Sequence, residues 1–400
     1  MRIAALIAGL LFCLSAVLDA FQTIILPRRP TGRLRITRFF YIATWSPWSA
    51  IARHTRNSKV REQIYSMFGP GSLLLLLMVW AMVLVAGFGL LFFALGTPFA
   101  DALAGSSRLA QLRTDLYVSG TTLFTLGIGD LVPRTLLARA LIVVESGTGL
   151  GFVALVIGYV PVLYGAFSRR EVSVALLDAR AGSPPTSTEL LRRHSFTGGQ
   201  DALVVLLIEW ERWSAEILES HISYPILCYY RSQHDNQSWL SALTAVLDSS
   251  ALLISVAPGV ASRQAQLTFA MARHALVDLG HVFHLEKHEA AWLARGGPER
   301  LPPASFHQVC DLMVEAGLRL CGDPDAPARL HALRALYEPH AQALADYLGM
   351  TLPGWVPEPR AKDQWKTVEA VRSKAMSVFK DRDSVISDQA VAVRLRSDDH

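Results

Sequence analysis

Long apolar segments are concentrated in the first 170 residues of this 400-residue chain. The segments 3–26, 73–95 and 140–167 would each form a helix long enough to cross a hydrocarbon layer about 30 Å thick, at about 1.5 Å rise per residue. Residues 171–400 have the mixed composition of an ordinary globular protein. The sequence therefore predicts a membrane part followed by a soluble part of about one to one-and-a-half domains.

The segment 3–26 is expected to remain in the membrane as a helix, with a cleaved signal peptide as the alternative. The segment is long for a signal peptide and lacks a clear small-residue cleavage site. It also ends in the basic sequence Pro27-Arg28-Arg29. These features favour a retained helix.

The loop between the first two spans carries nine Lys or Arg residues and one acidic residue, Glu62. This excess of positive charge places the loop in the cytoplasm. The amino terminus then lies outside and residues after 170 lie in the cytoplasm, as expected for an integral protein of the plasma (inner) membrane. Residues 39–51 are too short to span, and their aromatic side chains predict a helix at the membrane interface. As a span, this segment would put the two arginine clusters on opposite sides.

Charge and cysteine content argue against several classes of protein. The net charge of +4 is too small to indicate a nucleic-acid-binding protein. The four cysteines, Cys13, Cys228, Cys310 and Cys321, form no C-x-x-C pair, so neither a zinc site nor a disulfide framework is indicated. No helix with an arginine at every third position occurs, so no voltage sensor is indicated.

A short segment between the second and third spans carries the strongest functional signal. Residues 112–124 are apolar enough for a helix but too short to cross the bilayer, so a re-entrant element is expected. The sequence Thr125-Leu126-Gly127-Ile128-Gly129-Asp130 follows directly. A plain turn is the alternative for a Gly-x-Gly sequence alone. The position between two spans, on the predicted outer side, favours a pore.

The two glycines let alternate residues adopt positive φ, so that successive carbonyl groups can point toward one axis. Four such strands would stack rings of oxygens that replace the hydration shell of a cation, and the Thr125 hydroxyl would close the innermost ring. Leu126 and Ile128 would pack outward and brace this filter. The carboxyl end of the preceding helix would also favour cations in the cavity.

The segment resembles the potassium-channel signature Thr-Val-Gly-Tyr-Gly-Asp, followed after two residues by Pro. The matching residues are Thr122, Thr125, Gly127, Gly129, Asp130 and Pro133. The helix–pore loop–helix order over residues 72–170 is also similar to the two-helix module of pore-loop potassium channels. This resemblance implies four chains around one axis. It implies potassium ions and the lipid bilayer as partners, with K⁺ in the filter and no other cofactor.

Some residues depart from the family pattern. Leu126 stands where the family has Val, and Ile128 stands where it has Tyr. The positions of the aromatic cuff and of the acid behind the filter are occupied by Tyr117 and Thr121. Loss of the family's tyrosine removes a hydrogen bond that supports the filter, so the resemblance leaves the selectivity ratio open.

The third span is expected to line the cavity and to gate it. Gly149 lies where the family often has a hinge glycine, and Pro161 removes a backbone hydrogen bond. A moving hinge and simple close packing are both consistent with these residues. Leu150, Val153 and Ile157 would face the cavity. Glu145 and Asp19 are acids in membrane spans, which motivates the hypothesis of a pairing or proton-sensing role.

The cytoplasmic half is expected to be all-helical, because helical periodicity occurs in 201–218, 237–256, 263–294, 305–321 and 326–348. The linker 182–188 precedes it. His274, His281 and His288 recur at heptad spacing, but a polar helix face explains them more simply than a metal site, and no metal is predicted. Trp210, Trp213, Trp239 and Trp292 are expected in the core. No nucleotide-binding or β-barrel regulatory pattern occurs.

We therefore expect an all-α membrane channel with three transmembrane helices, a re-entrant pore helix and a cytoplasmic helical domain. The expected divisions are 1–71, 72–170, 171–355 and a flexible or frayed tail, 356–400. The leading function is passive K⁺ conduction by a homotetramer. The alternatives are a weakly selective cation channel and a membrane-anchored sensor or scaffold with a vestigial pore. No nucleophile or acid–base set accompanies the histidine helix, so no enzyme activity is expected.

Overall fold

The computed structural model describes residues 1–26, 35–96, 99–100, 107–195, 199–233, 237–257, 259, 261–294 and 299–357. The predictions for Arg28, Arg29 and the tail beyond residue 357 lie outside these described residues.

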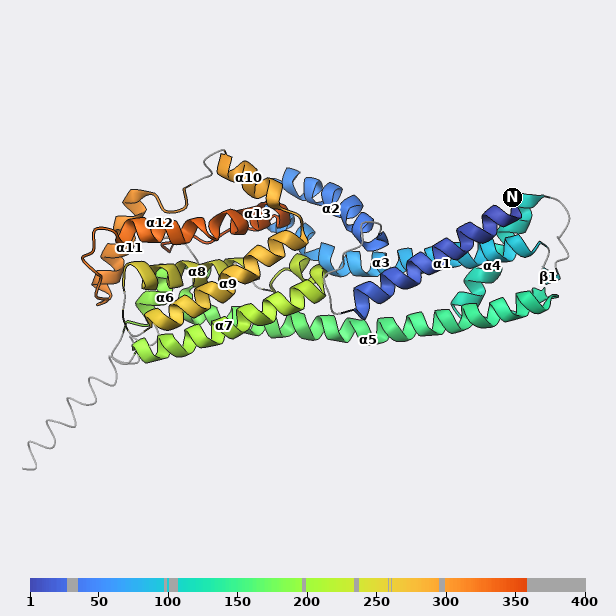
Figure 1. Cartoon of the computed structure of the whole chain (residues 1–400), viewed down its shortest axis with the longest axis horizontal. Helices are drawn as coiled ribbons and strands as arrows, with labels where there is room; N and C mark the ends of the chain where they lie inside the picture. Colours follow the sequence, from blue (N-terminus) through green and yellow to red (C-terminus); the bar gives the residue numbers. More distant parts are fainter. Residues whose placement is uncertain are drawn as a thin grey trace, which may run out of the picture.

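The molecule is elongated and helical, with a membrane part at one end and a helical domain at the other (Figure 1). The membrane part contains α1 (Arg2–Ile24), α2 (Ile36–His54), α3 (Ser58–Leu95), α4 (Arg108–Leu123) and α5 (Leu136–Ala181). The helical domain contains α6 (Ser187–Arg193), α7 (Gly199–Ser223), the 3₁₀ helix η1 (Pro225–Tyr229), α8 (Trp239–Ser255), α9 (Ser262–Val282), α10 (Glu286–Ala294), α11 (Pro303–Glu315), α12 (Ala326–Ala335) and α13 (Glu338–Leu348). Within the described ranges, one short antiparallel pair joins β1 (Phe99–Ala100) to β2 (Val132–Pro133). The all-α prediction is confirmed.

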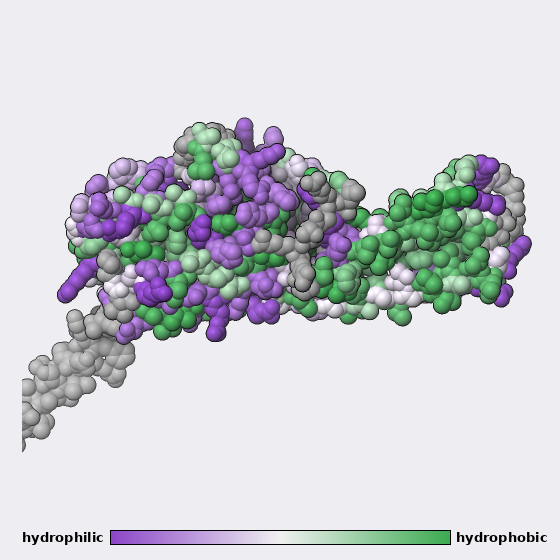
Figure 2. Space-filling view, viewed as in Figure 1, coloured by the Kyte–Doolittle hydropathy of each residue, from purple (hydrophilic) through white to green (hydrophobic). Residues whose placement is uncertain are grey.

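Three described helices, α1, α3 and α5, are long and apolar enough to cross a membrane. Figure 2 shows the corresponding apolar surface over one end of the molecule, whereas the helical domain is largely hydrophilic. The helix α2 is not among the three, in agreement with the prediction for residues 39–51. The amino terminus lies at the same end as the pore loop, far from the helical domain (Figure 1).

The helices α3 and α5 are longer than the apolar segments in them. The Asn57 side chain caps α3 by accepting hydrogen bonds from the backbone N–H groups of Lys59 and Val60, so α3 begins well before the predicted span. The helix α5 runs without interruption to Ala181 and ends at Gly182, whose φ is +85°. The third span therefore continues through the expected division at residue 170 into the helical domain.

The helix α2 packs against the helical domain through an aromatic cluster. The Trp45 ring lies 4.7 Å from the Phe68 ring of α3 and 4.8 Å from the Tyr229 ring of η1. The Trp45 indole N–H also donates to the Tyr347 carbonyl oxygen of α13. The predicted interfacial helix thus forms part of the junction between the two ends of the molecule.

In the helical domain, α8 is buried on all sides and forms the centre of the core. Two predicted helices are divided. The range 263–294 breaks at His284, whose φ is +55°, and the range 326–348 breaks just before Pro339. The prediction for 305–321 was too long, because α11 ends before Gly317, whose φ is +86°. Trp210, Trp213 and Trp239 are buried as expected, whereas Trp292 is only half-buried on α10.

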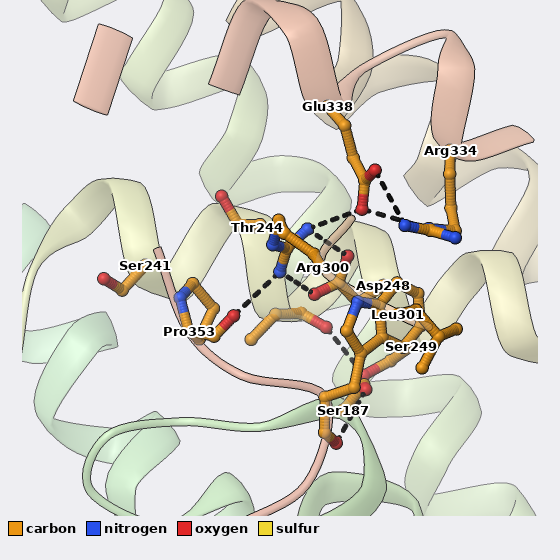
Figure 3. A network of polar contacts seen from close by, with 12 residues as sticks. Ser187, Ser241, Thr244, Asp248, Ser249, Arg300, Leu301, Arg334, Glu338 and Pro353 are labelled. Atoms are coloured by element: carbon orange, nitrogen blue, oxygen red, sulfur yellow. Dashed lines mark hydrogen bonds and ion pairs between the residues drawn. The ribbon is translucent and has the colours of Figure 1, made fainter. Parts of the chain in front are cut away.

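A buried ionic network fixes the last described segment to this core (Figure 3). Arg300 donates to the Asp248 carboxylate of α8, to Glu338 and to the Pro353 carbonyl oxygen. The Thr188 hydroxyl donates to the Trp355 carbonyl oxygen at 2.5 Å. These bonds join Pro353 to Arg300, and through it to α8, and they join Trp355 to α6, which directly follows α5. Buried charges in this network are compensated by partners of opposite sign.

Candidate pore loop and its coupling to the helical domain

Residues 125–130, called the filter segment below, lie directly after the predicted re-entrant helix. The helix α4 begins at a Ser107 cap and ends at Leu123. The backbone N–H of Thr125 donates to the Thr122 carbonyl oxygen, and that of Leu126 donates to the Thr121 carbonyl oxygen. Thr121 and Thr122 therefore fix the start of the filter segment to the carboxyl end of α4.

Backbone dihedral angles alternate along the filter segment as the glycine spacing predicts. Gly127 and Gly129 have φ of +55° and +79°. Thr125 also has a positive φ, +54°, which the glycine argument did not predict. Residues with left-handed φ at every second position turn successive carbonyl groups toward the same side. This is the backbone conformation that a ring of carbonyl oxygens requires.

The two large apolar side chains of the filter segment are mostly exposed in the part of the chain that the structure describes. Leu126 is 65% exposed and Ile128 is 59% exposed. The expectation that these side chains brace the filter is therefore not met by the chain's own residues. Apolar side chains of this size at membrane depth need lipid or protein around them.

The carboxylate at the end of the filter segment bonds to the pore helix. The Tyr117 hydroxyl donates to Asp130 Oδ2 at 2.9 Å. Just beyond, β2 pairs with β1, with Phe99 opposite Pro133. Tyr117 therefore holds the outer end of the filter segment, whereas Thr121 bonds locally to the Val118 carbonyl oxygen.

Gly149 lies where α5 crosses the end of the pore helix. A Cβ atom at this position would lie 1.9 Å from the Leu123 carbonyl oxygen, which is far inside van der Waals contact. The close approach gives Gly149 a packing reason, which was the alternative to a hinge. Pro161 lies within the continuous helix α5.

Replacement of Gly149 by alanine is expected to separate α5 from α4 and to abolish ion flux in reconstituted vesicles. Gly71→Ala is the matched control, because a Cβ atom at Gly71 of α3 meets nothing within 4 Å. Flux from Gly149→Ala at the control level would show that this contact is dispensable.

The predicted cavity residues lie on the exposed side of α5. Leu150, Val153 and Ile157 are 65%, 45% and 68% exposed. The opposite side of α5, including Leu163 and Phe167, is buried against the chain's own helices. Residues 150, 153 and 157 are thus available to line a space between copies of the chain.

The two acids in the membrane spans have different surroundings. Glu145 is fully buried behind the pore helix, where the Ser119 hydroxyl bonds to its Oε1 atom, while Oε2 has no partner in the described chain. Asp19 is fully bonded: it accepts from Arg35 at 3.1 Å, from Thr37 and from the Trp80 indole at 2.9 Å. Asp19 therefore anchors α1 and α2 to α3, as the pairing hypothesis allowed. The role of Glu145 remains a hypothesis.

Arg170 joins α5 to the helical domain, a role that the sequence reasoning missed. It is 2% exposed, and its guanidinium group donates to the Leu227 and Tyr230 carbonyl oxygens of the η1 region, both at 2.8 Å. The Tyr230 ring in turn lies against Gly69 of α3. In the sequence analysis, residue 170 was only the point after which the chain was expected in the cytoplasm.

His221 of α7 lies beside Arg170 and is buried as a neutral base. Its Nε2 atom lies 3.2 Å from Arg170 Nη1 and accepts from it, since a guanidinium group can only donate. Burial, and then the positive charge of Arg170, lower the pKa of His221 well below its usual range.

This environment predicts a pH-dependent stability of the helical domain. Because the folded-state pKa is below that of the unfolded chain, the unfolded state binds a proton first as pH falls below about 6.5. The contribution of His221 to stability is therefore complete above that pH and is lost as pH falls below it. We expect His221→Gln to flatten the fall in melting temperature between pH 7 and pH 5, measured by thermal unfolding in detergent. The exposed His274 provides the control as His274→Gln. An unchanged slope in His221→Gln would contradict this assignment.

Among the described residues, no group of three or more His, Cys, Asp or Glu side chains could hold a metal ion. His274 and His281 each lie near Asp278, at 3.7 and 3.9 Å.

Comparison with known proteins supports a channel identity for the membrane part. Residues 78–163 match a family model described as "Ion channel". An uncharacterised membrane protein, YdjJ, of Bacillus subtilis (strain 168) is 25% identical over 337 residues, which cover 81% of this chain and 94% of that protein. No solved structure matches the chain. The matched residues contain the end of α3, the pore helix, the filter segment and most of the membrane part of α5. Residues 78–163 are therefore similar to an ion-channel family, and this similarity supports a pore-loop channel module in the membrane part.

Proposed function

We propose that four copies of this chain form a potassium-selective channel in the plasma (inner) membrane. The observation that supports this most strongly is the alternation of left-handed φ at Thr125, Gly127 and Gly129. Carbonyl oxygens replace water around a dehydrated K⁺ ion without any charged side chain. The exposed Leu126 and Ile128 would then pack against neighbouring chains around the axis.

In this proposal the amino terminus lies outside and the helical domain lies in the cytoplasm. The basic loop between α1 and α3 supports this orientation, because positive residues are retained on the cytoplasmic side. The helical domain would regulate the pore through Arg170 and α5, and it would catalyse no reaction of its own.

A weakly selective cation channel is the second candidate, and Ile128 is the observation that favours it. An isoleucine cannot donate the side-chain hydrogen bond by which a tyrosine at this position would support the filter. The Tyr117–Asp130 hydrogen bond supports only the outer end of the segment.

The test is the reversal potential of purified protein in planar bilayers with K⁺ on one side and Na⁺ on the other. A potential close to the K⁺ equilibrium value supports the selective channel, and a potential near zero supports the weakly selective one. A protein that assembles but passes neither ion would contradict both and leave the scaffold alternative.

A further inference from the structure

The helix α5 has a continuous exposed face that extends beyond the membrane. At 100° per residue, Val172 lies about 40° around the helix from the cavity residue Leu150, and Leu176 lies about 80° from it. The buried residues Val174 and Leu177 lie at about 240° and 180°. The face that would line the pore thus continues, in the same helical phase, past Arg170 into the helical domain.

This face carries aliphatic side chains where lipid cannot cover them. Val172 and Leu176 are each 58% exposed, although they follow the basic residues at the membrane boundary. Lipid explains exposed apolar residues in the membrane part of α5, but Val172 and Leu176 follow the end of that part. Exposed aliphatic residues that continue a membrane interface into water indicate a contact with protein.

The helix α7 adds two further aliphatic residues on the same side of the domain. Arg180 of α5 pairs with Glu209 of α7 at 3.2 Å, which places the neighbouring Ile208 beside the carboxyl end of α5. Ile208 is 48% exposed and Val205, one turn earlier, is 55% exposed. Figure 1 shows α5 and α7 along one long edge of the molecule, and Figure 2 shows apolar surface among the polar residues of that edge.

We propose that this face, formed by Val172, Leu176, Val205 and Ile208, is where the helical domains of neighbouring copies of the chain meet around the pore axis. The proposal rests on the tetrameric pore proposed above. A second copy of the chain would cover this face, because the face continues the one that the pore itself would bring around the axis. The helical domains would then assemble together with the pore and move with the inner ends of α5.

Crosslinking of single-cysteine variants tests the contact in full-length protein. The half-buried Cys13, Cys310 and Cys321 are first replaced by serine and the buried Cys228 by alanine, and the resulting background protein gives the baseline. Val172→Cys and Leu176→Cys are treated in membranes with a short bismaleimide. Val314→Cys on α11 is the matched control, since Val314 is also a 58% exposed aliphatic residue. Ile157→Cys reports on the pore itself.

We expect Leu176→Cys and Val172→Cys to give at least tenfold more crosslinked product, of any size from dimer to tetramer, than Val314→Cys gives. Ile157→Cys should also be crosslinked. Leu176→Asp should lower the fraction of tetramer that survives dilution in detergent at least fivefold relative to Val314→Asp. Crosslinking at Ile157→Cys but not at residues 172 and 176 would overturn this inference and leave the channel proposal standing. Absence of crosslinking at all three positions would overturn the tetrameric pore as well.

Discussion

Replacement of Gly127 by alanine is expected to reduce K⁺ flux at least about 100-fold. Gly127 has φ of +55°, and a left-handed conformation costs a residue with a Cβ atom about 1–2 kcal/mol. In the proposed tetramer four chains contribute to one filter, so the total cost would be about 4–8 kcal/mol. Because each 1.4 kcal/mol changes an equilibrium tenfold, the conducting arrangement of carbonyl groups would become rare. The measurement is K⁺ uptake into vesicles that contain equal amounts of protein.

Gly120→Ala is the control for this experiment. Gly120 lies seven residues earlier on the pore helix, with helical backbone, and a Cβ atom there meets nothing within 4 Å. This variant should assemble and conduct, since alanine favours a helix by about 1 kcal/mol relative to glycine. Equal flux from Gly127→Ala and Gly120→Ala would rule out a backbone filter at this position.

The membrane architecture could be read from the sequence because its determinants are local. Apolar length identified α1, α3 and α5, and the short segment before Thr125 identified α4. The glycine spacing also predicted the left-handed backbone at Gly127 and Gly129. These features depend on few neighbours in space, so a single sequence contains enough information to predict them.

The junction with the helical domain could not be predicted in the same way. Arg170, Leu227 and Tyr230 are far apart in the sequence, and nothing in their local pattern indicates that they meet. The same holds for Asp248 and Arg300, whose buried pairing depends on the packing of several helices. Helix ends at His284 and Gly317 were missed because they depend on single left-handed residues inside periodic segments. The face on α5 was visible only once α5 proved to be continuous to Ala181.

Replacement of Arg170 by methionine is expected to lower the open probability at least about tenfold while leaving single-channel conductance unchanged. Arg170 lies on the side of α5 opposite to Leu150, so its bonds hold α5 toward the chain's own η1 region, and away from the axis of the proposed tetramer. Methionine removes the donor to the Tyr230 carbonyl oxygen, which costs about 1–3 kcal/mol for a buried acceptor. It also removes the second of the two hydrogen bonds to the Leu227 carbonyl oxygen, which keeps the backbone N–H of Tyr230 as a donor. The inner ends of α5 would then approach one another, and the aliphatic residues at 150 and 157 would close a hydrophobic constriction.

Arg180→Met separates this effect from a general loss of charge on α5. Arg180 lies on the same helix, but its bond to Glu209 is solvent-exposed and contributes at most about 1 kcal/mol. The open probability of Arg180→Met should therefore stay close to that of the wild-type protein. In Arg170→Lys the lysine can replace some of the lost donors. The open probability of this variant should therefore lie between those of Arg170→Met and Arg180→Met. A structural defect alone would reduce the number of channels, whereas the coupling predicts the same conductance with shorter openings. Wild-type open probability in Arg170→Met would mean that the helical domain does not act on the pore through this contact.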